Sequence, residues 1–468
     1  MAEMRINTPF DTIAAISTPP GEGGIGIVRL SGESAFSILK DIFSPHRTKK
    51  STSTPESFSM RLGHIVDHGD IIDEVLVSYM KAPHTYTRED VAEINCHGGA
   101  VAVSEVLRVV LSRGARLAEP GEFTKRAFIN GRIDLAQAEA VLDIVRSRTS
   151  LALEAAVSQL QGRLSSHITS VLDTLKSLLV TLEANIDFPE DEDVSEIGLE
   201  EMKRKITGAR DALAECVASY DTGRIIRDGV ITVLSGKPNV GKSSILNAFL
   251  KFERAIVTPI PGTTRDVIEE QLNIQGIPFI LADTAGITES ENVIEQEGVK
   301  RSRSYMKRAQ LLLMVFDGSE EMDERDLEII GRARSAPCIP VVNKTDLPMK
   351  LDMEKLRSAF QDDPRFVFVS AKTGEGLKDL EKRMTEMVAG GSTEGENPFL
   401  ITSARHFSVL KRALRELRHA EDTLCADPEP ELLAYDVRST MDILGELTGE
   451  TTHNEILDEI FNNFCIGK

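Results

Sequence analysis

The sequence predicts a multidomain α/β + α protein, and three observations support this fold class. The apolar run at 230–234, a glycine-rich loop and an apolar segment at 244–250 have the order strand, loop, helix. Residues 1–118 alternate short β-like runs with helical stretches. From residue 134 onward, apolar residues recur at spacings of three and four, as they do in amphipathic helices.

Residues 1–118 are expected to form a small α/β domain. A polar segment at 45–55 is predicted to be a loop within it. The β-like runs lie at 12–16, 25–30 and 74–79, and the helical stretches lie at 35–42 and 101–111.

Helical sequence lies on both sides of the central α/β segment. An apolar stripe runs from Leu160 to Leu182 and stops at the breaker 187–189, and a second helix is expected over 199–217. Further helices are expected at 432–447 and 456–464, beyond a flexible linker at 390–395.

Each flank therefore has an apolar stripe that needs a partner. This need predicts one helical domain made of residues 119–223 and 381–468. Residues 224–380 are then a separate α/β domain inserted into the helical domain.

The loop Gly236-Lys-Pro-Asn-Val-Gly-Lys-Ser243 fits the phosphate-loop pattern G-x-x-x-x-G-K-[ST]. Gly236 and Gly241 let backbone N–H groups turn toward phosphates, and the positive end of the following helix adds to the attraction. Lys242 is expected to reach the β and γ phosphates, and the Ser243 hydroxyl is expected to bind Mg²⁺.

The choice of base is predicted from Asn343-Lys-Thr-Asp346. The Asp346 carboxylate only accepts hydrogen bonds, and guanine offers paired donors where adenine offers an acceptor at N1. Ser370-Ala-Lys372 follows another apolar run, and its backbone can meet the guanine O6. Both motifs come at the carboxyl ends of expected strands, where open α/β sheets bind ligands. GTP is therefore the predicted nucleotide.

Two further segments fit a nucleotide switch. Asp283-Thr-Ala-Gly286 follows the apolar run 277–282, so Asp283 is expected to hold Mg²⁺ through water and the Gly286 N–H to sense the γ-phosphate. Thr264 lies in the segment expected to order around Mg²⁺ and the γ-phosphate, and it is assigned as the second Mg²⁺ hydroxyl.

The group that orients the attacking water is missing from its usual place. Small GTPases place a glutamine directly after this Asp-x-x-Gly, and this chain has Ile287. The nearest carboxylates come from an acidic segment, and the pattern alone does not choose among them. They are Glu289, Glu291, Glu295 and Glu297.

Composition limits the class of protein. The 468 residues include 54 basic and 74 acidic side chains, and 54 − 74 gives a net charge of −20. A protein that coats nucleic acid through general basicity is thereby excluded. No apolar run approaches the roughly 18 residues of a membrane anchor, and we expect no signal peptide. The five scattered cysteines show no metal-ligand spacing and favour a reducing cytoplasm.

A basic stripe is the one candidate contact for RNA. It lies largely on one face of an expected helix, and an ordinary solvated face is the favoured alternative. The stripe consists of Arg405, Lys411, Arg412, Arg415, Arg418 and His419.

Over essentially its whole length, the chain resembles the MnmE (TrmE) family of tRNA-modification GTPases. The specific signatures lie outside the phosphate loop, which many NTPases share. They are Thr18-Pro-Pro-Gly-Glu-Gly-Gly-Ile-Gly-Ile-Val-Arg29, His97-Gly-Gly99, Pro120-Gly-Glu-Phe123, Arg126-Ala-Phe128, Asp134-Leu-Ala-Gln-Ala-Glu139 and the terminal Phe464-Cys-Ile-Gly-Lys468.

The resemblance implies an N-terminal α/β domain that dimerises and binds a formyl-tetrahydrofolate, a helical domain, and a Ras-like P-loop G domain inserted in it. It also implies work with the flavoprotein MnmG (GidA) in a heterotetramer. The two proteins would install an aminomethyl-type group, such as carboxymethylaminomethyl, at C5 of the wobble uridine in tRNA. The folate, 5-formyl-tetrahydrofolate or a related one-carbon form, would supply the carbon.

The same resemblance assigns residues to the ligands. Arg29, Glu93 and Arg132, with the terminal Lys468, would form the folate site. Face-to-face pairing of two G domains around K⁺ would replace an arginine finger, and Glu295 would orient the water. Without the resemblance, a structural ion pair would be the better interpretation of Glu93 and Arg132.

Lys242 and Glu295 are the predicted catalytic residues. The predicted Mg²⁺ ligands are Ser243 and Thr264, and the predicted K⁺ ligands are Asn239, Thr258, Ile260 and Thr263. The predicted nucleotide contacts are Gly236, Asn239, Val240, Gly241, Lys242, Ser243, Ser244, Thr258, Thr263, Thr264, Asp283, Thr284, Ala285, Gly286, Asn343, Lys344, Asp346, Ser370, Ala371 and Lys372.

Two alternatives remain. A GTPase switch of ribosome or RNP assembly, whose only reaction is hydrolysis, shares the central motifs but does not explain the N-terminal and C-terminal signatures. A respiratory or membrane-associated scaffold ranks last, because the sequence offers no apolar anchor.

Overall fold

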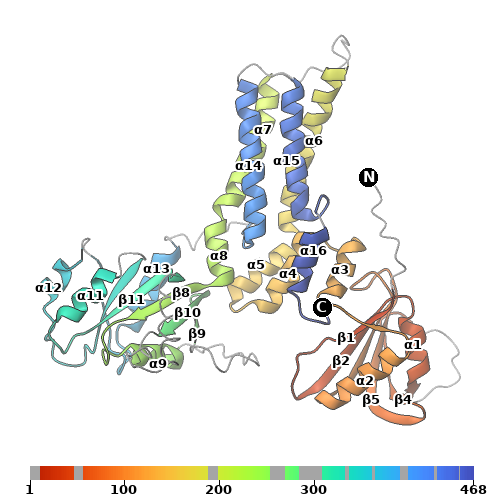
Figure 1. The fold of residues 1–468 in the computed structure, drawn as a ribbon, viewed down its shortest axis with the longest axis horizontal. Helices are drawn as coiled ribbons and strands as arrows, with labels where there is room; N and C mark the ends of the chain where they lie inside the picture. The colour runs from red at the N-terminus through yellow and green to blue at the C-terminus, as the bar shows by residue number, and fades with distance from the viewer. Residues whose placement is uncertain are drawn as a thin grey trace. The chain divides into compact units, whose positions relative to one another are not determined.

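The computed structural model describes residues 11–46, 56–187, 199–252, 269–283, 308–332, 337–360, 364–389, 399–425, 430–452 and 454–468 (Figure 1). The chain divides into two compact units. The first unit comprises residues 1–142, 160–166 and 442–468, and the second comprises 143–159 and 167–441.

The first unit contains a seven-stranded sheet in the order β3-β4-β5-β6-β2-β1-β7. Only the β1–β7 pair is parallel. α1 (Ala35–Ile42) and α2 (Ala100–Ser112) share a core with the sheet, because their apolar sides pack on strand residues such as Leu30 and Ile94. The strands are β1 (Ile13–Ile16), β2 (Gly23–Ser31), β3 (Phe43–Pro45), β4 (Ser59–Asp67), β5 (Asp70–Met80), β6 (Val91–Gly98) and β7 (Arg116–Leu117).

The elements predicted for residues 1–118 are confirmed as β1, β2, β5, α1 and α2. The prediction of a loop from residue 45 is wrong at its first position, because Pro45 belongs to β3. Residues 47–55 lie outside the described ranges. β4 and β6, which complete the centre of the sheet, were not predicted.

Three helices of the first unit surround a second, smaller core. They are α3 (Glu122–Ile129), the start of α4 (Leu135–Arg146) and α16 (Asn454–Asn462). Ala127, Leu135, Phe461 and Phe464 are buried together in this core, so the C-terminal helix packs beside the start of α4. The helix predicted over 456–464 is confirmed as α16.

The second unit contains a six-stranded sheet in the order β13-β12-β11-β8-β10-β9. Its strands are parallel except β9, which pairs antiparallel with β10. The strands predicted from the apolar runs at 230–234 and 277–282, and those expected before the motifs that begin at Asn343 and Ser370, are confirmed. The six are β8 (Val230–Ser235), β9 (Glu269–Ile274), β10 (Ile277–Asp283), β11 (Leu311–Asp317), β12 (Cys338–Asn343) and β13 (Val367–Phe368).

Helices cover both faces of this sheet (Figure 1). Val233 and Leu234 are neighbours in β8 and belong to opposite cores, as the two-residue period of a strand requires. α9 (Lys242–Phe252) and α13 (Leu377–Ala389) share the core of Leu234, and α11 (Glu324–Arg332) and α12 (Met353–Ser358) share that of Val233.

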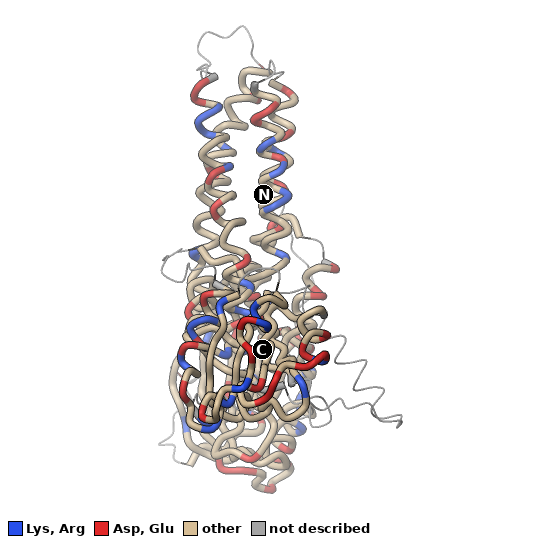
Figure 2. The backbone as a smooth tube through the Cα atoms, turned by 90° about the vertical axis from the view of Figure 1, so that its left-hand side faces the viewer, with Lys and Arg blue, Asp and Glu red and all other residues tan. Residues whose placement is uncertain are grey.

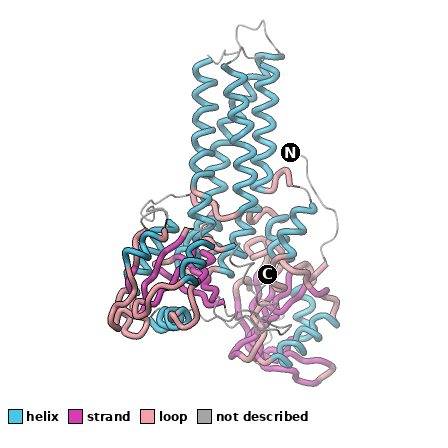
Figure 3. Tube along the Cα trace, turned by 60° about the vertical axis from the view of Figure 1, so that its left-hand side comes forward, coloured by secondary structure: helices cyan, strands magenta, loops and turns pink. Residues whose placement is uncertain are grey.

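Long helices make up much of the rest of the chain (Figure 3). They include α5 (Ser150–Leu160), α6 (Arg163–Asp187), α7 (Leu199–Ala218), α8 (Tyr220–Asp228), α14 (Ala404–Cys425) and α15 (Pro430–Thr448). α7 packs along α14, and Arg210 of α7 donates to Glu421 of α14 over 2.6 Å. The helices predicted over 199–217 and 432–447 are confirmed. The stop predicted at 187–189 stays a prediction, because residues 188 and 189 lie outside the described ranges.

The stripe from Leu160 to Leu182 does not belong to one helix. α5 ends at Leu160 and α6 begins at Arg163. Gly162 between them has φ +79°, a conformation that glycine adopts without strain. The spacing of apolar residues continues across this break and therefore conceals it.

Two of the predicted domain boundaries fall inside helices, and the third, after residue 118, lies between β7 and α3. Position 223 lies within α8, and position 380 lies within α13, whose Met384 belongs to the same core as Leu380. The domain limits stay predictions. In the described ranges, no helix is both long and apolar enough to cross a bilayer.

Candidate functional site

The predicted nucleotide motifs meet at one edge of the six-stranded sheet. Parallel pairing sets Asp283 at the end of β10 beside Leu234 of β8, and Asn343 at the end of β12 beside Asp317 of β11. Because the carboxyl ends of parallel strands share an edge, the phosphate loop after β8 joins the base motifs there.

The phosphate loop is held tightly. A Cβ on Gly236 would overlap with the Val315 carbonyl oxygen. Gly241 has φ +95°, and a Cβ there would overlap with Asn343 Nδ2. Asn239 also has a positive φ, 64°. No larger residue fits the two glycine positions without moving a neighbour, which explains their place in the motif.

Lys242 lies inside this loop. Its buried Nζ donates to the carbonyl oxygens of Gly236 at 2.8 Å and Lys237 at 2.7 Å. The amine is thus surrounded by backbone oxygens at the start of α9, where the helix dipole also attracts anions. Ser243 and Ser244 follow in the exposed first turn of α9.

Asn343 joins the phosphate side of the site to the base side. Its side chain is buried, with Nδ2 donating to the Val240 carbonyl at 2.8 Å and Oδ1 accepting from the Ala371 N–H at 3.1 Å. Three separate motifs, in the phosphate loop, at the end of β12 and after β13, are connected by this one carboxamide. Asn343 therefore acts as a positioning residue.

Asp346 is fixed by the last motif. Ser370 Oγ donates to Asp346 Oδ1 at 2.8 Å, and Lys372 Nζ lies 3.9 Å from Oδ2. Ser370 Oγ also accepts from the Thr373 N–H at 3.2 Å. The carboxylate predicted to read guanine is thereby oriented by the segment predicted to meet the guanine O6.

Two ion pairs at this edge were not predicted. Lys344 pairs with buried Asp317, and Lys237 Nζ lies 2.8 Å from buried Asp326. Burial tends to raise the pKa of Asp317, but the Lys344 amine and Ser319 lower it overall. The partners are far apart in sequence, and no local pattern pairs them; Lys344 reaches Asp317 because β11 and β12 are neighbours, whereas Asp326 lies on α11.

Several predicted residues lie outside the described ranges. They are Thr258, Ile260, Thr263, Thr264, Thr284, Ala285, Gly286, Ile287 and the four glutamates Glu289, Glu291, Glu295 and Glu297. The proposed roles in K⁺ binding and water orientation stay predictions, as does the second Mg²⁺ hydroxyl.

A second site lies on the sheet of the first unit. Arg29 of β2 faces Glu93 of β6 in the strand register. Arg29 Nε donates to Glu93 Oε1 at 2.8 Å, and a second guanidinium nitrogen lies 2.8 Å from the same oxygen. The other carboxylate oxygen of Glu93 takes no part in this pair.

The C-terminal tail reaches this ion pair. Ile466 forms an antiparallel bridge with Pro120. The Gly467 carbonyl accepts from Ser17 Oγ at 3.1 Å and from Arg29 at 3.4 Å. Lys468 is therefore set beside Arg29, and burial together with the Arg29 charge lowers the pKa of its amine.

Arg132 approaches the same region from the segment between α3 and α4. Its guanidinium lies 4.6 Å from the centroid of the Tyr86 ring and donates to the Tyr86 carbonyl at 3.2 Å. Arg29 lies 5.6 Å from the same ring. Tyr86, which was not predicted, thus lies near two cations, and Glu93 pairs with Arg29 rather than with Arg132.

Family models match most of the chain. The "MnmE helical domain" matches residues 135–465, and the "GTP-binding protein TrmE N-terminus" matches residues 12–132. The helical model spans both sides of the six-stranded sheet, as expected for an insertion.

Curated relatives match over the full length. Proteins named "tRNA modification GTPase MnmE" are 48% identical over 98% of this chain and 99% of the relative from Natranaerobius thermophilus, and 46% over 98% and 99% for Alkaliphilus oremlandii. The relative from Geobacillus thermodenitrificans is 45% identical over 98% of this chain and 100% of its own length.

Among solved structures, Aquifex aeolicus Era bound to GDP·AlF₄⁻ matches 40% of this chain and 65% of its own at 26% identity, with a TM-score of 0.28. Sequence likeness over the whole chain, together with a nucleotide edge built from the expected motifs, settles the family. The protein is a GTP-hydrolysing enzyme of tRNA modification, and it belongs to the MnmE family.

Proposed function

We propose that this protein works with an MnmG-type flavoprotein to install a carboxymethylaminomethyl or aminomethyl group at C5 of the wobble uridine in tRNA. GTP- and K⁺-dependent pairing of two G domains in a cytoplasmic homodimer switches the reaction. The observation that supports this function most directly is the contact between the Gly467 carbonyl and Arg29. It brings Lys468 close to Arg29 on a sheet that also carries Glu93.

The residues of the second site suit a reduced folate. Glu93 compensates the charge of Arg29, and the neighbouring Lys468 adds a second cation, which suits the anionic glutamate tail of a folate. Glu93 can accept from amino and ring N–H groups of a pterin. When bound, the folate supplies the one-carbon unit. Arg29, Glu93 and Lys468 bind and orient it, and Arg132 remains stacked on Tyr86 at the rim.

The nucleotide edge suits a triphosphate with hard cations. The Ser243 hydroxyl in the exposed first turn of α9 offers the oxygen that Mg²⁺ requires, and the exposed Asn239 carboxamide offers another for K⁺. Lys242, held among backbone oxygens, exchanges those contacts for phosphate oxygens. Glu295 remains the proposed carboxylate that orients the attacking water.

The proposal is tested by mass spectrometry of tRNA nucleosides from cells that lack this gene. We expect wobble uridine without its C5 group, and restoration by the wild-type gene but not by Arg29→Ala. Intact modification in the deletion strain would reject the proposed function.

The catalytic assignment has its own test. Glu295→Ala should keep GTP binding and lose hydrolysis, whereas Lys242→Ala should lose binding itself. Glu289→Ala and Glu291→Ala serve as controls within the same acidic segment. Normal turnover by the Glu295 variant would show that another carboxylate orients the water.

A further inference from the structure

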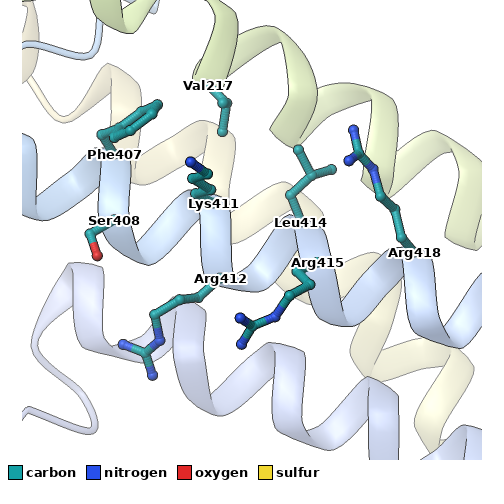
Figure 4. Close-up of a pocket in the computed structure, with 8 residues that line it drawn as sticks. All are labelled: Val217, Phe407, Ser408, Lys411, Arg412, Leu414, Arg415 and Arg418. Carbon is teal, nitrogen blue, oxygen red and sulfur yellow. The ribbon is translucent and has the colours of Figure 1, made fainter.

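A hollow with a basic rim lies on the surface of α14 in the second unit. Its volume is about 620 Å³. Buried Leu414 and partly buried Val217 of α7 form its apolar part. The other lining residues are Phe407, Ser408, Lys411, Arg412, Arg415 and Arg418. Figure 4 shows Lys411 and Arg418 on the side of Val217, and Arg412 and Arg415 extending to the other side of α14.

Only part of the predicted basic stripe lines the hollow. His419 is not in the lining, and its Nδ1 lies 2.8 Å from Asp436 of α15. Arg405 does not line the hollow. The four remaining cations are exposed on α14, in a chain whose net charge is −20. Figure 2 shows basic and acidic positions interspersed along much of the described backbone.

Three of these cations can exchange their present contacts for an anion. Lys411 and Arg418 form no ion pair with the described side chains. Arg415 touches Glu416 at 3.3 Å with 74% of its side chain exposed, and such surface pairs contribute little. Lys411, Arg415 and Arg418 follow one another along about 10 Å of helix, at 1.5 Å per residue.

The ring at one end of the hollow narrows the choice of ligand. Phe407 stacks on Tyr220 at 4.1 Å between centroids, and Lys411 Nζ lies 5.5 Å from the same ring. A nucleobase would have to displace one of these neighbours to stack there. The groups left exposed are therefore cations, which suit a row of phosphates. Among the residues that the structure describes, an aromatic ring that could stack on a base is not exposed at this end of the hollow.

We propose that Lys411, Arg415 and Arg418 bind the phosphate backbone of the tRNA substrate. This inference rests on the proposed function and adds the surface that holds the RNA. The contact is independent of base sequence and weakens with salt. Because the three cations are exposed and Leu414 is buried, we assign the affinity to charge.

The test is fluorescence anisotropy of a labelled tRNA transcript with the full-length protein over a series of salt concentrations. The variant Lys411→Gln/Arg415→Gln/Arg418→Gln should bind more weakly, and the slope of log affinity against log salt should fall by about 2 to 3 for three lost phosphate contacts. The matched control Lys176→Gln/Lys203→Gln/Arg204→Gln removes the same charge from exposed positions of α6 and α7 and should bind like wild type.

Other outcomes overturn the inference. If the triple variant in the hollow kept wild-type affinity and slope, the hollow would belong to another partner, such as an acidic protein segment. Equal losses of affinity in both triple variants would show a general charge effect rather than a binding site. GTP hydrolysis by the triple variant in the hollow should match that of the wild-type protein. If cells that lack the gene carry fully modified tRNA, the proposed function fails, whatever the hollow binds. If only the anisotropy titration of the hollow variant is negative, the proposed function stands.

Discussion

At the scale of single residues, the nucleotide motifs are connected to one another through their own side chains. Asn343 holds Val240 and Ala371, and Ser370 holds Asp346. A buried carboxamide with both ends bonded stabilises a unique geometry, and loss of either partner leaves an unsatisfied polar group. The carboxylate of Asp346, which we propose reads the base, therefore has its direction set by the protein.

Asp346→Asn should exchange the base preference. The new amide presents a donor to guanine's donors, so GTP should bind about 5- to 150-fold more weakly, which corresponds to roughly 1–3 kcal/mol. Xanthine carries an oxygen in place of the guanine amine, so its triphosphate should gain affinity. Competition against a fluorescent GTP analogue measures both changes.

The exposed Asp379→Asn in α13 is the control, since it changes the same charge away from the site. Unchanged GTP affinity in the Asp346 variant would mean that another group reads the base.

The lowered pKa of Lys468 leads us to expect that folate affinity depends on pH. Burial and then the Arg29 charge lower the pKa of its amine from 10.5. An anion bound beside it would raise that pKa again, so binding should take up protons, and affinity should fall as the pH rises through the lowered value. Calorimetry with 5-formyl-tetrahydrofolate in buffers of different ionisation enthalpy measures the uptake.

Lys468→Arg keeps the positive charge at alkaline pH. This variant should bind without the alkaline loss of affinity. The assignment of Lys468 fails if wild type and variant show the same pH profile.

At the scale of elements, local patterns predicted much of the fold. Parallel strands that end in polar motifs indicated the nucleotide edge, because strand order places all such ends together. Helix spacing indicated α6, α7, α14 and α15. The break at Gly162 was not predicted, because the apolar spacing continues across it. Only the backbone conformation changes there, to a positive φ.

Contacts between distant segments could not be predicted from local patterns. The tail bridge from Ile466 to Pro120 and the pairing of Lys344 with Asp317 depend on tertiary packing. The resemblance placed Lys468 near Arg29, but neither the Gly467 contact nor the approach of Arg29 and Arg132 to the Tyr86 ring has a sequence signal. Spacing alone gave no reason to pair Glu93 with Arg29, which face each other only through strand register.

The phosphate loop offers a test of an element. Gly241→Ala should weaken GTP binding and lower stability, because its φ of +95° costs about 1–2 kcal/mol for any other residue and its Cβ would contact Asn343. Thermal unfolding and nucleotide titration measure the two effects.

Gly208→Ala is the matched control. Gly208 lies exposed within α7, and a methyl group at this position would meet no atom within 4 Å, so alanine there should stabilise by about 0.5–1 kcal/mol. Equal behaviour of the two variants would show that the loop tolerates a side chain.

At the scale of the whole molecule, the chain has two candidate ligand sites of different character. The nucleotide edge consists of backbone and short polar groups, which we propose respond to the presence of a γ-phosphate. The second site consists of long cationic side chains at the C-terminal tail and on β2, which we propose respond to an anionic ligand. One helical family model spans the residues on either side of the G-domain sheet, so a nucleotide-driven change has a continuous polypeptide route to the helices.

The proposed switch predicts that pairing of two copies of the G domain depends on both the γ-phosphate and the monovalent cation. Small-angle scattering of the full-length protein with GDP and aluminium fluoride should show a more compact particle in K⁺ than in Na⁺, since K⁺ is the ion proposed to replace an arginine finger. Lys242→Ala, which loses the amine at the centre of the phosphate loop, should show no difference between the salts. Glu295→Ala should still become compact, because it binds the nucleotide and lacks only the carboxylate that orients water. A particle size that is indifferent to the γ-phosphate mimic in both salts would reject G-domain pairing as the switch, while leaving GTP binding at the sheet edge intact.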